Sequence, residues 1–388
     1  MGQGLIIAFG VMGLLAMGIS WAWNRMSLAD VSYVRHLPLQ RVFLGEVISL
    51  RVTLTNKKPV PLLWVSVEDE VPDALEVVEG DIAANIMPDV QTLRHLTSMS
   101  WYERVKWDYR LRCVKRGMYR IGPARLESGD PFGFLRSRKH EPKQDYLVIY
   151  PRVYPLEDLG IPSARPLGDV KGGLAIFPDP ARPAGIRDYR VGDPLKTVDW
   201  KATARQQRLQ VCTYEPSTTY TVILIVAVDT VEPFWGAYVP EDLERVISTA
   251  ASVAHYGVER HFSVGLFAND MPAVPGRPMT VMPSYGLEQL SVILGALANV
   301  RAYAIGPMSA QLSQNAGRFP LGSTLAVFTA LLNKEFAAAL DDLKHRGYKV
   351  VVFYLGEKEP PPIPDGVVFH SVREHMITLE EAGQHVAG

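Results

Sequence analysis

The stretch Tyr220–Asp229, YTVILIVAVD, decides the fold of the C-terminal half of the chain. Its residues are nearly all apolar and many are β-branched, which is typical of a strand covered on both faces. The next segment, Glu241–Tyr256, has apolar residues on one side of a helix, namely Leu243, Val246, Ile247, Ala250 and Val253. Asp242 is expected to cap this helix near its start. A buried strand followed by an amphipathic helix is the repeating unit of a layered α/β domain.

The rest of the C-terminal half repeats this alternation. Further strands are expected at Phe262–Phe267, Thr324–Ala330, Lys349–Leu355 and Gly366–Ser371, and further helices at Leu287–Val300 and Lys334–Arg346. The pattern predicts a doubly wound α/β domain over residues 216–388, with a loose tail after Thr378.

Residues 31–160 follow a period of two instead. In Glu46–Thr55 and in Trp107–Cys113, apolar and polar residues alternate, as in strands with one face turned inward. Turn sequences such as Gly129-Asp130-Pro131 separate the short strands. We therefore predict an antiparallel β-sandwich of immunoglobulin-like type over residues 31–160. The same phase puts Cys113 on the inner face, as a small core residue rather than a nucleophile.

The N-terminal stretch Gly4–Trp23 contains no charged residue. As a helix it would extend about 30 Å at ~1.5 Å per residue, the hydrocarbon thickness of a bilayer. A cleaved signal peptide is the rival interpretation, but it favours basic residues first and a small-residue site after the apolar core, whereas Trp21 and Trp23 end this run. The prediction is a single-pass transmembrane helix within an anchor and linker of residues 1–30, with residues 4–23 in contact with membrane lipid.

The basic residues Arg25, Arg35 and Arg41 follow the span and none precedes it. Basic residues are enriched in cytoplasmic flanks, so we expect the soluble part to lie in the cytoplasm.

The bulk composition excludes several classes of protein. The chain has 40 basic and 41 acidic residues, a balance that does not point to nucleic acid. Its two cysteines, Cys113 and Cys212, match no metal or redox spacing. The sequence contains no phosphate-binding glycine loop, no HExxH and no GxSxG. We expect no cofactor and no catalytic residue of a familiar type.

Between the two predicted domains, residues 161–215 form a linker whose centre is the polar stretch Gly185–Arg208, GIRDYRVGDPLKTVDWKATARQQR. Its charged residues are interleaved by sign: Arg187, Asp188, Arg190, Asp193, Lys196, Asp199, Lys201, Arg205 and Arg208. A polar stretch with two aromatic residues, Tyr189 and Trp200, before a buried strand is typical of a junction rather than of ordinary surface.

One potential cation site lies at Asp229, which ends the first strand of the predicted α/β domain. Von Willebrand factor type A domains bind a divalent cation there through a DxSxS motif. In this chain the two serine positions are Val231 and Pro233, and no aspartate follows the later strand near Thr329. A hard cation needs several oxygen ligands, so we predict a degenerate site that binds no metal.

The junction resembles the signature of the domain-of-unknown-function 58 family. The matching residues are Gly185-Ile186-Arg187-Asp188-Tyr189, then Gly192-Asp193-Pro194, then Asp199-Trp200-Lys201 with Ala204-Arg205, and Leu209. Upstream, Arg116–Pro123, Asp130–Phe134 and Tyr150-Pro151 fit as well. The resemblance implies a membrane-anchored protein from gene neighbourhoods with MoxR-type AAA+ ATPases. It also implies a von Willebrand type A-like C-terminal part and no established enzymatic activity.

The spacing of the signature suggests how it folds. Gly192-Asp193-Pro194 is typical of a turn into a helix, with Asp193 as N-cap, Pro194 in the first turn and the helix ending at Arg205. Three interpretations stay open: an ion-paired clasp between the two domains, a docking surface for a partner, and a catalytic site. The candidate signature or interaction residues are Arg187, Asp188, Tyr189, Arg190, Gly192, Asp193, Pro194, Asp199, Trp200, Lys201 and Arg205.

Two functions follow as hypotheses. The first is a non-enzymatic membrane-anchored scaffold or adaptor that acts with a MoxR-type AAA+ ATPase, and with membrane proteins of the same gene neighbourhood, in protein assembly or maturation. The alternative is an envelope-associated hydrolase or transferase that uses Asp199 and neighbouring charged residues. A cation-dependent adhesion module would need both the opposite topology and a rebuilt metal site.

Overall fold

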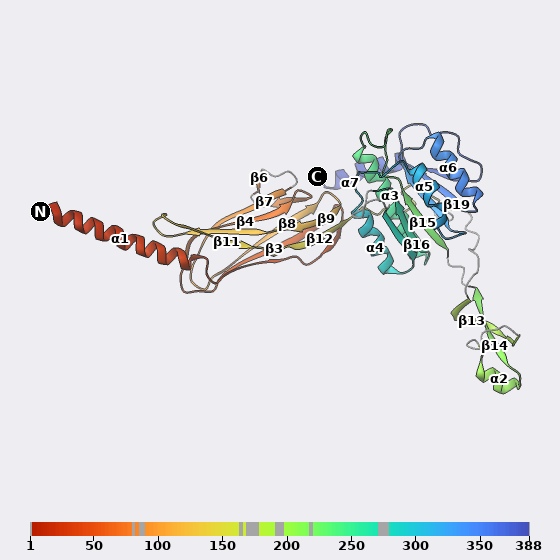
Figure 1. Ribbon diagram of the computed structural model, residues 1–388, viewed down its shortest axis with the longest axis horizontal. Coiled ribbons are helices and arrows are strands. Elements are labelled where there is room, and N and C mark those ends of the chain that lie inside the picture. Colours follow the sequence, from red (N-terminus) through yellow and green to blue (C-terminus); the bar gives the residue numbers. More distant parts are fainter. Residues whose placement is uncertain are drawn as a thin grey trace. The chain divides into compact units, whose positions relative to one another are not determined.

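A computed structural model describes residues 2–79, 82–84, 90–162, 166–167, 178–190, 198–216, 220–270 and 279–387. The chain divides into two compact units, Met1–Arg152 with Leu297–Asn299 and Val153–Ala296 with Val300–Gly388. Figure 1 shows the elements of both units, and each unit is described by itself.

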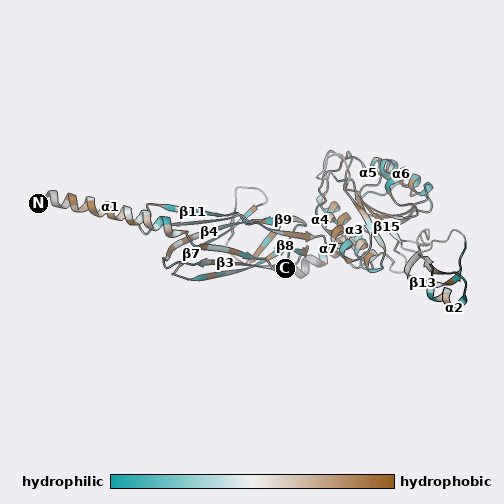
Figure 2. Cartoon of the chain, turned by 60° about the horizontal axis from the view of Figure 1, so that its bottom comes forward, coloured by the Kyte–Doolittle hydropathy of each residue, from teal (hydrophilic) through white to brown (hydrophobic). Residues whose placement is uncertain are grey.

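The first unit begins with the long helix α1 (Gly2–Ser27). Its stretch Ile6–Ser27 is long and apolar enough to cross a membrane, which no other helix in the described part of the chain is. Figure 2 shows the hydrophobic residues along α1 in brown. The expectation of an N-terminal apolar helix is therefore confirmed.

Three sheets follow α1. The first has the order β1-β3-β8-β5, the second β11-β10-β4-β7-β6 and the third β2-β12-β9. All neighbours pair antiparallel except β12 and β2, which are parallel. The strands are β1 (Val31–His36), β2 (Arg41–Phe43), β3 (Val47–Asn56), β4 (Leu62–Pro72), β5 (Leu75–Glu79), β6 (Ile82–Ala84), β7 (Val90–Met99), β8 (Arg104–Cys113), β9 (Gly117–Ile121), β10 (Ala124–Gly129), β11 (Arg136–Glu141) and β12 (Asp145–Tyr150).

Alternation in the sequence determines which face of each strand is buried. In β3 every second side chain is buried, and these include Leu50 and Leu54, which have no exposed surface. Side chains from strands of all three sheets belong to one hydrophobic core. Cys113 lies in this core with no exposed surface, as the period of two predicted, and burial raises the pKa of its thiol to about 11.

A buried ion pair crosses this core. The guanidinium of Arg35 on β1 donates to the carboxylate of Asp69 on β4, and Tyr33 donates its hydroxyl to the same carboxylate at 2.6 Å. A second carboxylate, that of Asp145 on β12, accepts from Arg35 at 2.9 Å. One arginine thus joins a strand from each of the three sheets.

The second unit contains a sheet of six strands in the order β17-β16-β15-β18-β19-β20. The five strands from β16 to β20 in this order are parallel, and β17 is an antiparallel edge. The bounds are β15 (Thr221–Val226), β16 (Ser263–Ala268), β17 (Met279–Ser284), β18 (Thr324–Thr329), β19 (Lys349–Tyr354) and β20 (Val368–Ser371). The central strand β18 is buried at every position, as expected of a strand between two layers.

Helices pack on both faces of this sheet. Side chains of α5 and α6 share a core with Ile223, Ile225 and Val327, which point to one face, and α3 contacts β15, β16 and β18 without contributing to that core. The bounds are α3 (Pro240–Glu259), α4 (Leu287–Ala298), α5 (Met308–Asn315), a 3-10 turn (Ala316–Arg318), α6 (Lys334–His345) and α7 (Arg373–Ala387). The alternation of strands and helices predicted from the sequence is present, whereas β17, α5 and α7 were not anticipated.

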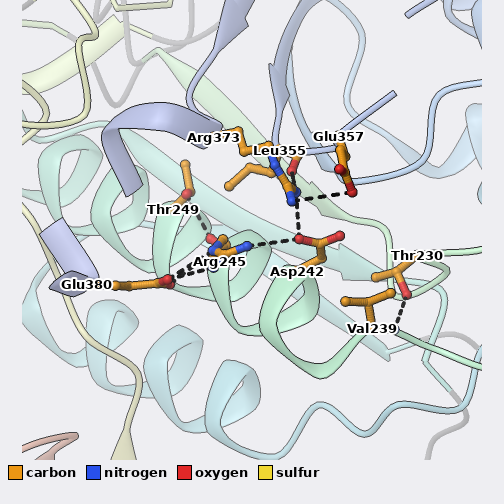
Figure 3. A network of polar contacts seen from close by, with 9 residues as sticks. All are labelled: Thr230, Val239, Asp242, Arg245, Thr249, Leu355, Glu357, Arg373 and Glu380. Atoms are coloured by element: carbon orange, nitrogen blue, oxygen red, sulfur yellow. Dashed lines mark hydrogen bonds and ion pairs between the residues drawn. The ribbon is translucent and has the colours of Figure 1, made fainter. Parts of the chain in front are cut away.

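Two local expectations were wrong. Asp242 does not cap α3, because Val239 occupies the N-cap position and Pro240 begins the helix. Instead the Asp242 carboxylate accepts hydrogen bonds from Arg245 at 3.1 Å and from Arg373 at 2.7 Å (Figure 3).

The segment after Thr378 is helical rather than loose, because it continues α7 to Ala387. Arg245 of α3 holds this helix by donating Nε to both oxygens of Glu380, at 3.2 and 3.0 Å, and Nη2 to Oε2 at 2.8 Å (Figure 3).

Removing the buried guanidinium should destabilise the first unit strongly. We expect Arg35→Met to cost about 3–5 kcal/mol in free energy of unfolding, because it leaves the Asp69 carboxylate buried without its partner. The measurement is denaturant unfolding of the full chain in detergent. The matched control is Arg51→Met, which breaks the exposed pair Arg51–Asp108 and should cost less than about 1 kcal/mol. Equal effects of the two substitutions would contradict the structural role of Arg35.

Candidate functional site

The signature stretch forms two strands and a short helix in the second unit. β13 (Pro178–Asp188) pairs antiparallel with β14 (Gln210–Pro216), and α2 (Trp200–Gln206) lies between them in sequence. Gly192, Asp193 and Pro194 lie outside the described residues, so their predicted turn is not located.

The prediction of a helix from Pro194 to Arg205 was wrong about its first residue. Val198 forms a bridge with Val211, and the amide of Asp199 donates to the carbonyl of Gln210 at 2.9 Å. The backbone is therefore extended at Val198 and Asp199, and the helix begins at Trp200. Its N-cap is Asp199, whose Oδ1 accepts from the amides of Lys201 at 2.9 Å and Ala202 at 3.0 Å.

The Asp199 carboxylate is held in its ionised form by this cap. The amide of Ala202 lowers the pKa of Asp199 most, and the amide of Lys201 and the Cys212 thiol, whose Sγ is 3.7 Å from Oδ2, lower it further. A carboxylate that accepts helix amides at low pKa stabilises a helix start and is poorly suited to donate a proton at neutral pH.

The helix α2 presents its side chains to solvent. No residue of α2 is buried, and Trp200 is 68% exposed. Lys201 and Arg205 are exposed as well. A tryptophan exposed to this extent next to cationic residues has the composition of an interaction surface.

The remaining candidate residues lie at the end of β13 and just beyond it. The carboxylate of Asp188 accepts a hydrogen bond from the side-chain amide of Gln210, and Arg187 donates to the carbonyl of Asp188 at 3.1 Å. The amide of Tyr189 continues the pairing by donating to the carbonyl of Leu209 at 2.9 Å. Tyr189 is half-buried and Arg190 exposed. The interpretation of this segment as an ion-paired clasp between the two domains stays a prediction.

A second polar centre lies at the carboxyl edge of the six-stranded sheet, around Asp229. Its Oδ1 accepts from the amide nitrogen of Asn269 at 2.7 Å, and its Oδ2 accepts from the backbone amide of Met308 at 3.2 Å. Asn269 itself is fully buried, accepts from the amide of Val228 at 2.7 Å and donates to the carbonyl of Gly306 at 2.9 Å. Burial raises the pKa of Asp229, and the two donors oppose that shift.

These contacts assign a structural role to the Asp229 carboxylate. They join the ends of β15 and β16 to the start of α5. Within the described residues no group of three or more His, Cys, Asp or Glu side chains could hold a metal ion. Sequence reasoning singled out Asp229 but missed Asn269, although Asn269 follows the next strand and parallel strands end at the same edge of a sheet.

Beside Asp229 the same edge carries an open groove of about 430 Å³. Val231 and Pro233, which replace the serines of the cation motif, line this groove together with Glu232, Trp235 and Phe336. Trp235 is 75% exposed. The groove therefore combines apolar and acidic surface.

The sequence comparisons cover both of these centres. The model of the family described as protein of unknown function DUF58 matches residues 185–351. The chain is also similar to "Uncharacterized protein YeaD" of Bacillus subtilis, at 25% identity over 294 residues, which are 73% of this chain and 66% of that protein. The chain thus spans slightly less than two thirds of this relative's length.

Solved structures resemble only part of the chain. The CARDB domain of the PF1109 protein from Pyrococcus furiosus matches with a TM-score of 0.22 and 12% identity, over 31% of this chain and 92% of that chain. A non-cellulosomal cohesin from Archaeoglobus fulgidus matches with a TM-score of 0.22 and 11% identity, over 30% of this chain and 91% of that chain. These scores are too low to assign the fold of either unit.

Truncating Asn269 should loosen the carboxyl edge. We expect Asn269→Ala to cost about 2 kcal/mol or more in free energy of unfolding, because the buried amide of Val228 and Oδ1 of Asp229 lose their partner. Thermal unfolding of the full chain in detergent measures it. The matched control is Asn315→Ala, since the Asn315 amide bonds only within its own turn, to Gln311. A loss no larger than that of the control would contradict the assigned role of Asn269.

Divalent cations should leave the protein unchanged. Calorimetric titration of the full chain with Mg²⁺ or Mn²⁺ is expected to give no stoichiometric binding and no shift in Tm, because the Asp229 oxygens already accept hydrogen bonds from protein donors. Stoichiometric binding that Asp229→Asn abolishes would overturn the prediction of a degenerate site.

Proposed function

We propose that this chain is a non-enzymatic, membrane-anchored scaffold or adaptor that binds a partner protein through the exposed surface of the signature segment. A MoxR-type AAA+ ATPase, acting in protein assembly or maturation, is the partner that the family resemblance implies. The observation that carries the proposal is the exposure of Trp200 on a helix that buries none of its residues. Exposed tryptophan and arginine side chains are the commonest sources of binding energy at protein interfaces.

The hydrogen bonding of two carboxylates supports binding over catalysis. Asp199, the group on which an envelope hydrolase or transferase would depend, accepts the first amides of α2. Asp229, at the edge where α/β sheets bind ligands, accepts from Asn269 and Met308. An exposed tryptophan lies close in sequence to each carboxylate, Trp200 and Trp235. This arrangement favours a protein ligand over a chemical step.

The fold interpretation belongs to the same proposal. We interpret the first unit as a β-sandwich, because its antiparallel sheets contribute to one core. We interpret the second unit as a von Willebrand type A-like domain with a degenerate cation site, because its sheet is parallel with helices on both faces. A domain of this kind fits an adaptor.

The anchor is α1, with the soluble part in the cytoplasm. Two contacts argue that α1 is retained rather than cleaved: Ser20 donates its hydroxyl to Asp130, and the ammonium of Lys58 donates to the carbonyl of Ser27. Of the basic residues after the span, Arg25 is exposed whereas Arg35 is buried in the core. The basic residues that favour a cytoplasmic location of the soluble part are therefore Arg25 and Arg41.

Truncation of Trp200 should weaken capture of the partner. We expect Trp200→Ala to lower the amount of MoxR-type ATPase that co-purifies with the full chain from solubilised membranes by about tenfold, since a hot-spot side chain contributes more than about 1.4 kcal/mol. Quantitative immunoblotting of the eluate is the measurement, and Arg187→Ala should act in the same direction.

Two further variants make this result specific. Tyr303→Ala is the matched control, because Tyr303 is 69% exposed elsewhere on the second unit and should leave capture unchanged. Trp235→Ala reports whether the groove at the sheet edge contributes. Capture that survives Trp200→Ala and Arg187→Ala, or an absence of any ATPase in the wild-type eluate, would refute the proposed partner.

A further inference from the structure

The turn between β10 and β11 carries two exposed phenylalanines. In the sequence DPFGF, Asp130–Phe134, Phe132 is 51% exposed and Phe134 is 61% exposed, and their rings stack with centroids 5.9 Å apart. Each of the two stacked apolar rings keeps more than half of its surface exposed. Such a pair calls for an apolar environment outside the protein.

Hydrogen bonds fix this turn beside α1. The hydroxyl of Ser20 donates to Oδ2 of Asp130 at 2.7 Å, and both residues are buried. The helix contacts β10 and β11, and Figure 1 shows α1 meeting the strands of the first unit at the end where β11 lies. Asp130 also accepts from the amides of Phe132 at 2.9 Å and Leu135 at 2.6 Å, so its charge is fully engaged within the turn.

The position of Ser20 along α1 gives the depth of the Asp130–Phe134 turn in the bilayer. If the apolar run Gly4–Trp23 fills the hydrocarbon layer, Ser20 lies only about 5 Å inside the layer's edge, at ~1.5 Å per residue. The Asp130 turn is at the level of Ser20. Phe132 and Phe134 therefore lie where the hydrocarbon layer meets the lipid headgroups.

A second pair of exposed aromatic residues lies further from the bilayer centre. Trp101 is 66% exposed and Tyr102 is 67% exposed, and the amide of Tyr102 donates to the carbonyl of Lys58. The ammonium of Lys58 in turn donates to the carbonyl of Ser27, the last residue of α1. Ser27 is about 10 Å along the helix from Ser20. Apolar rings thus lie deeper and the amphipathic Trp and Tyr further out, which is the order of aromatic residues across a membrane interface.

We propose that the Asp130–Phe134 turn inserts Phe132 and Phe134 into the interface of the same bilayer that α1 crosses. The first unit is then attached to the membrane at two points, by the span and by this turn, and cannot rotate freely about α1. The inference rests on the anchoring role of α1 in the proposed function, but not on the partner, and it holds for either orientation of the span.

The test measures the depth of single spin labels in the full chain, reconstituted in nanodiscs of phosphatidylcholine and phosphatidylglycerol. Labels are attached to Phe132→Cys, Phe134→Cys, Trp101→Cys and Met118→Cys in a Cys212→Ser background, in which the remaining Cys113 is buried. Met118 is the aqueous control. Its side chain is 60% exposed, and it follows the end of β8 that pairs with Val47, the first residue of β3. The other end of the ten-residue strand β3 is Asn56, which pairs with Val31 close to α1. The two ends of β3 are about 30 Å apart.

The accessibility ratio of oxygen to a water-soluble nickel complex should rise at least fivefold from position 118 to positions 132 and 134, with position 101 in between. Equal accessibility ratios at positions 118, 132 and 134 in reconstituted chains would overturn the proposal. Labels at positions 132 and 134 that neither oxygen nor the nickel complex reaches, because protein covers them, would overturn it as well. A chain that fails to enter nanodiscs would refute the anchor itself, and this outcome is separate from the result of partner capture. Thermal unfolding of each labelled variant establishes that the fold is kept.

Discussion

A buried carboxylate at the end of a central strand is the constraint on which the second unit depends. Asp229 lies at the carboxyl edge of β15 and is nearly inaccessible to water. A charge in that position is costly unless it is hydrogen-bonded. The chain supplies the donors from two other places, the Asn269 side chain after β16 and the amide of Met308 at the start of α5. The hydrogen bonds to the Asp229 carboxylate therefore tie the ends of β15 and β16 to the start of α5.

Other carboxylates of the chain likewise position structural elements through their hydrogen bonds and ion pairs. Asp199 starts α2, Asp242 and Glu380 hold the helices α3 and α7 together through Arg245, and Asp130 shapes a turn against α1. In each case the carboxylate stabilises the fold, and beside Asp199 and Asp130 aromatic side chains are exposed, namely Trp200, Phe132 and Phe134. This arrangement is consistent with the two proposals, a protein partner at Trp200 and lipid at Phe132 and Phe134.

The fold was predictable wherever one periodicity dominates a segment. The alternation in Glu46–Thr55 produced β3 with its inner face buried, and the apolar run at Tyr220–Asp229 contains β15. The short helix α5 and the C-terminal helix α7 were missed because their residues are mostly polar. Contacts with a helix far away in the sequence hold α7, among them the pair between Glu380 and Arg245 and the pair between Arg373 and Asp242. Pattern within a segment carries no information about such a contact.

The sequence singled out the signature residues and Asp229, but it predicted neither their geometry nor the contact of Asn269. The sequence by itself determined which segments are apolar, which strands have one buried face, and that a polar stretch with Trp200 precedes the α/β part, because these are local properties of composition and spacing. Only the tertiary structure decided that the N-cap of α2 is Asp199 rather than Asp193, because Val198 forms a β-bridge with Val211. It likewise decided that Asn269 binds Asp229 and that the Asp130 turn lies beside Ser20. The physical reason is the same in each case: a polar group takes the partner that folding brings within reach, and that partner is far away in the sequence.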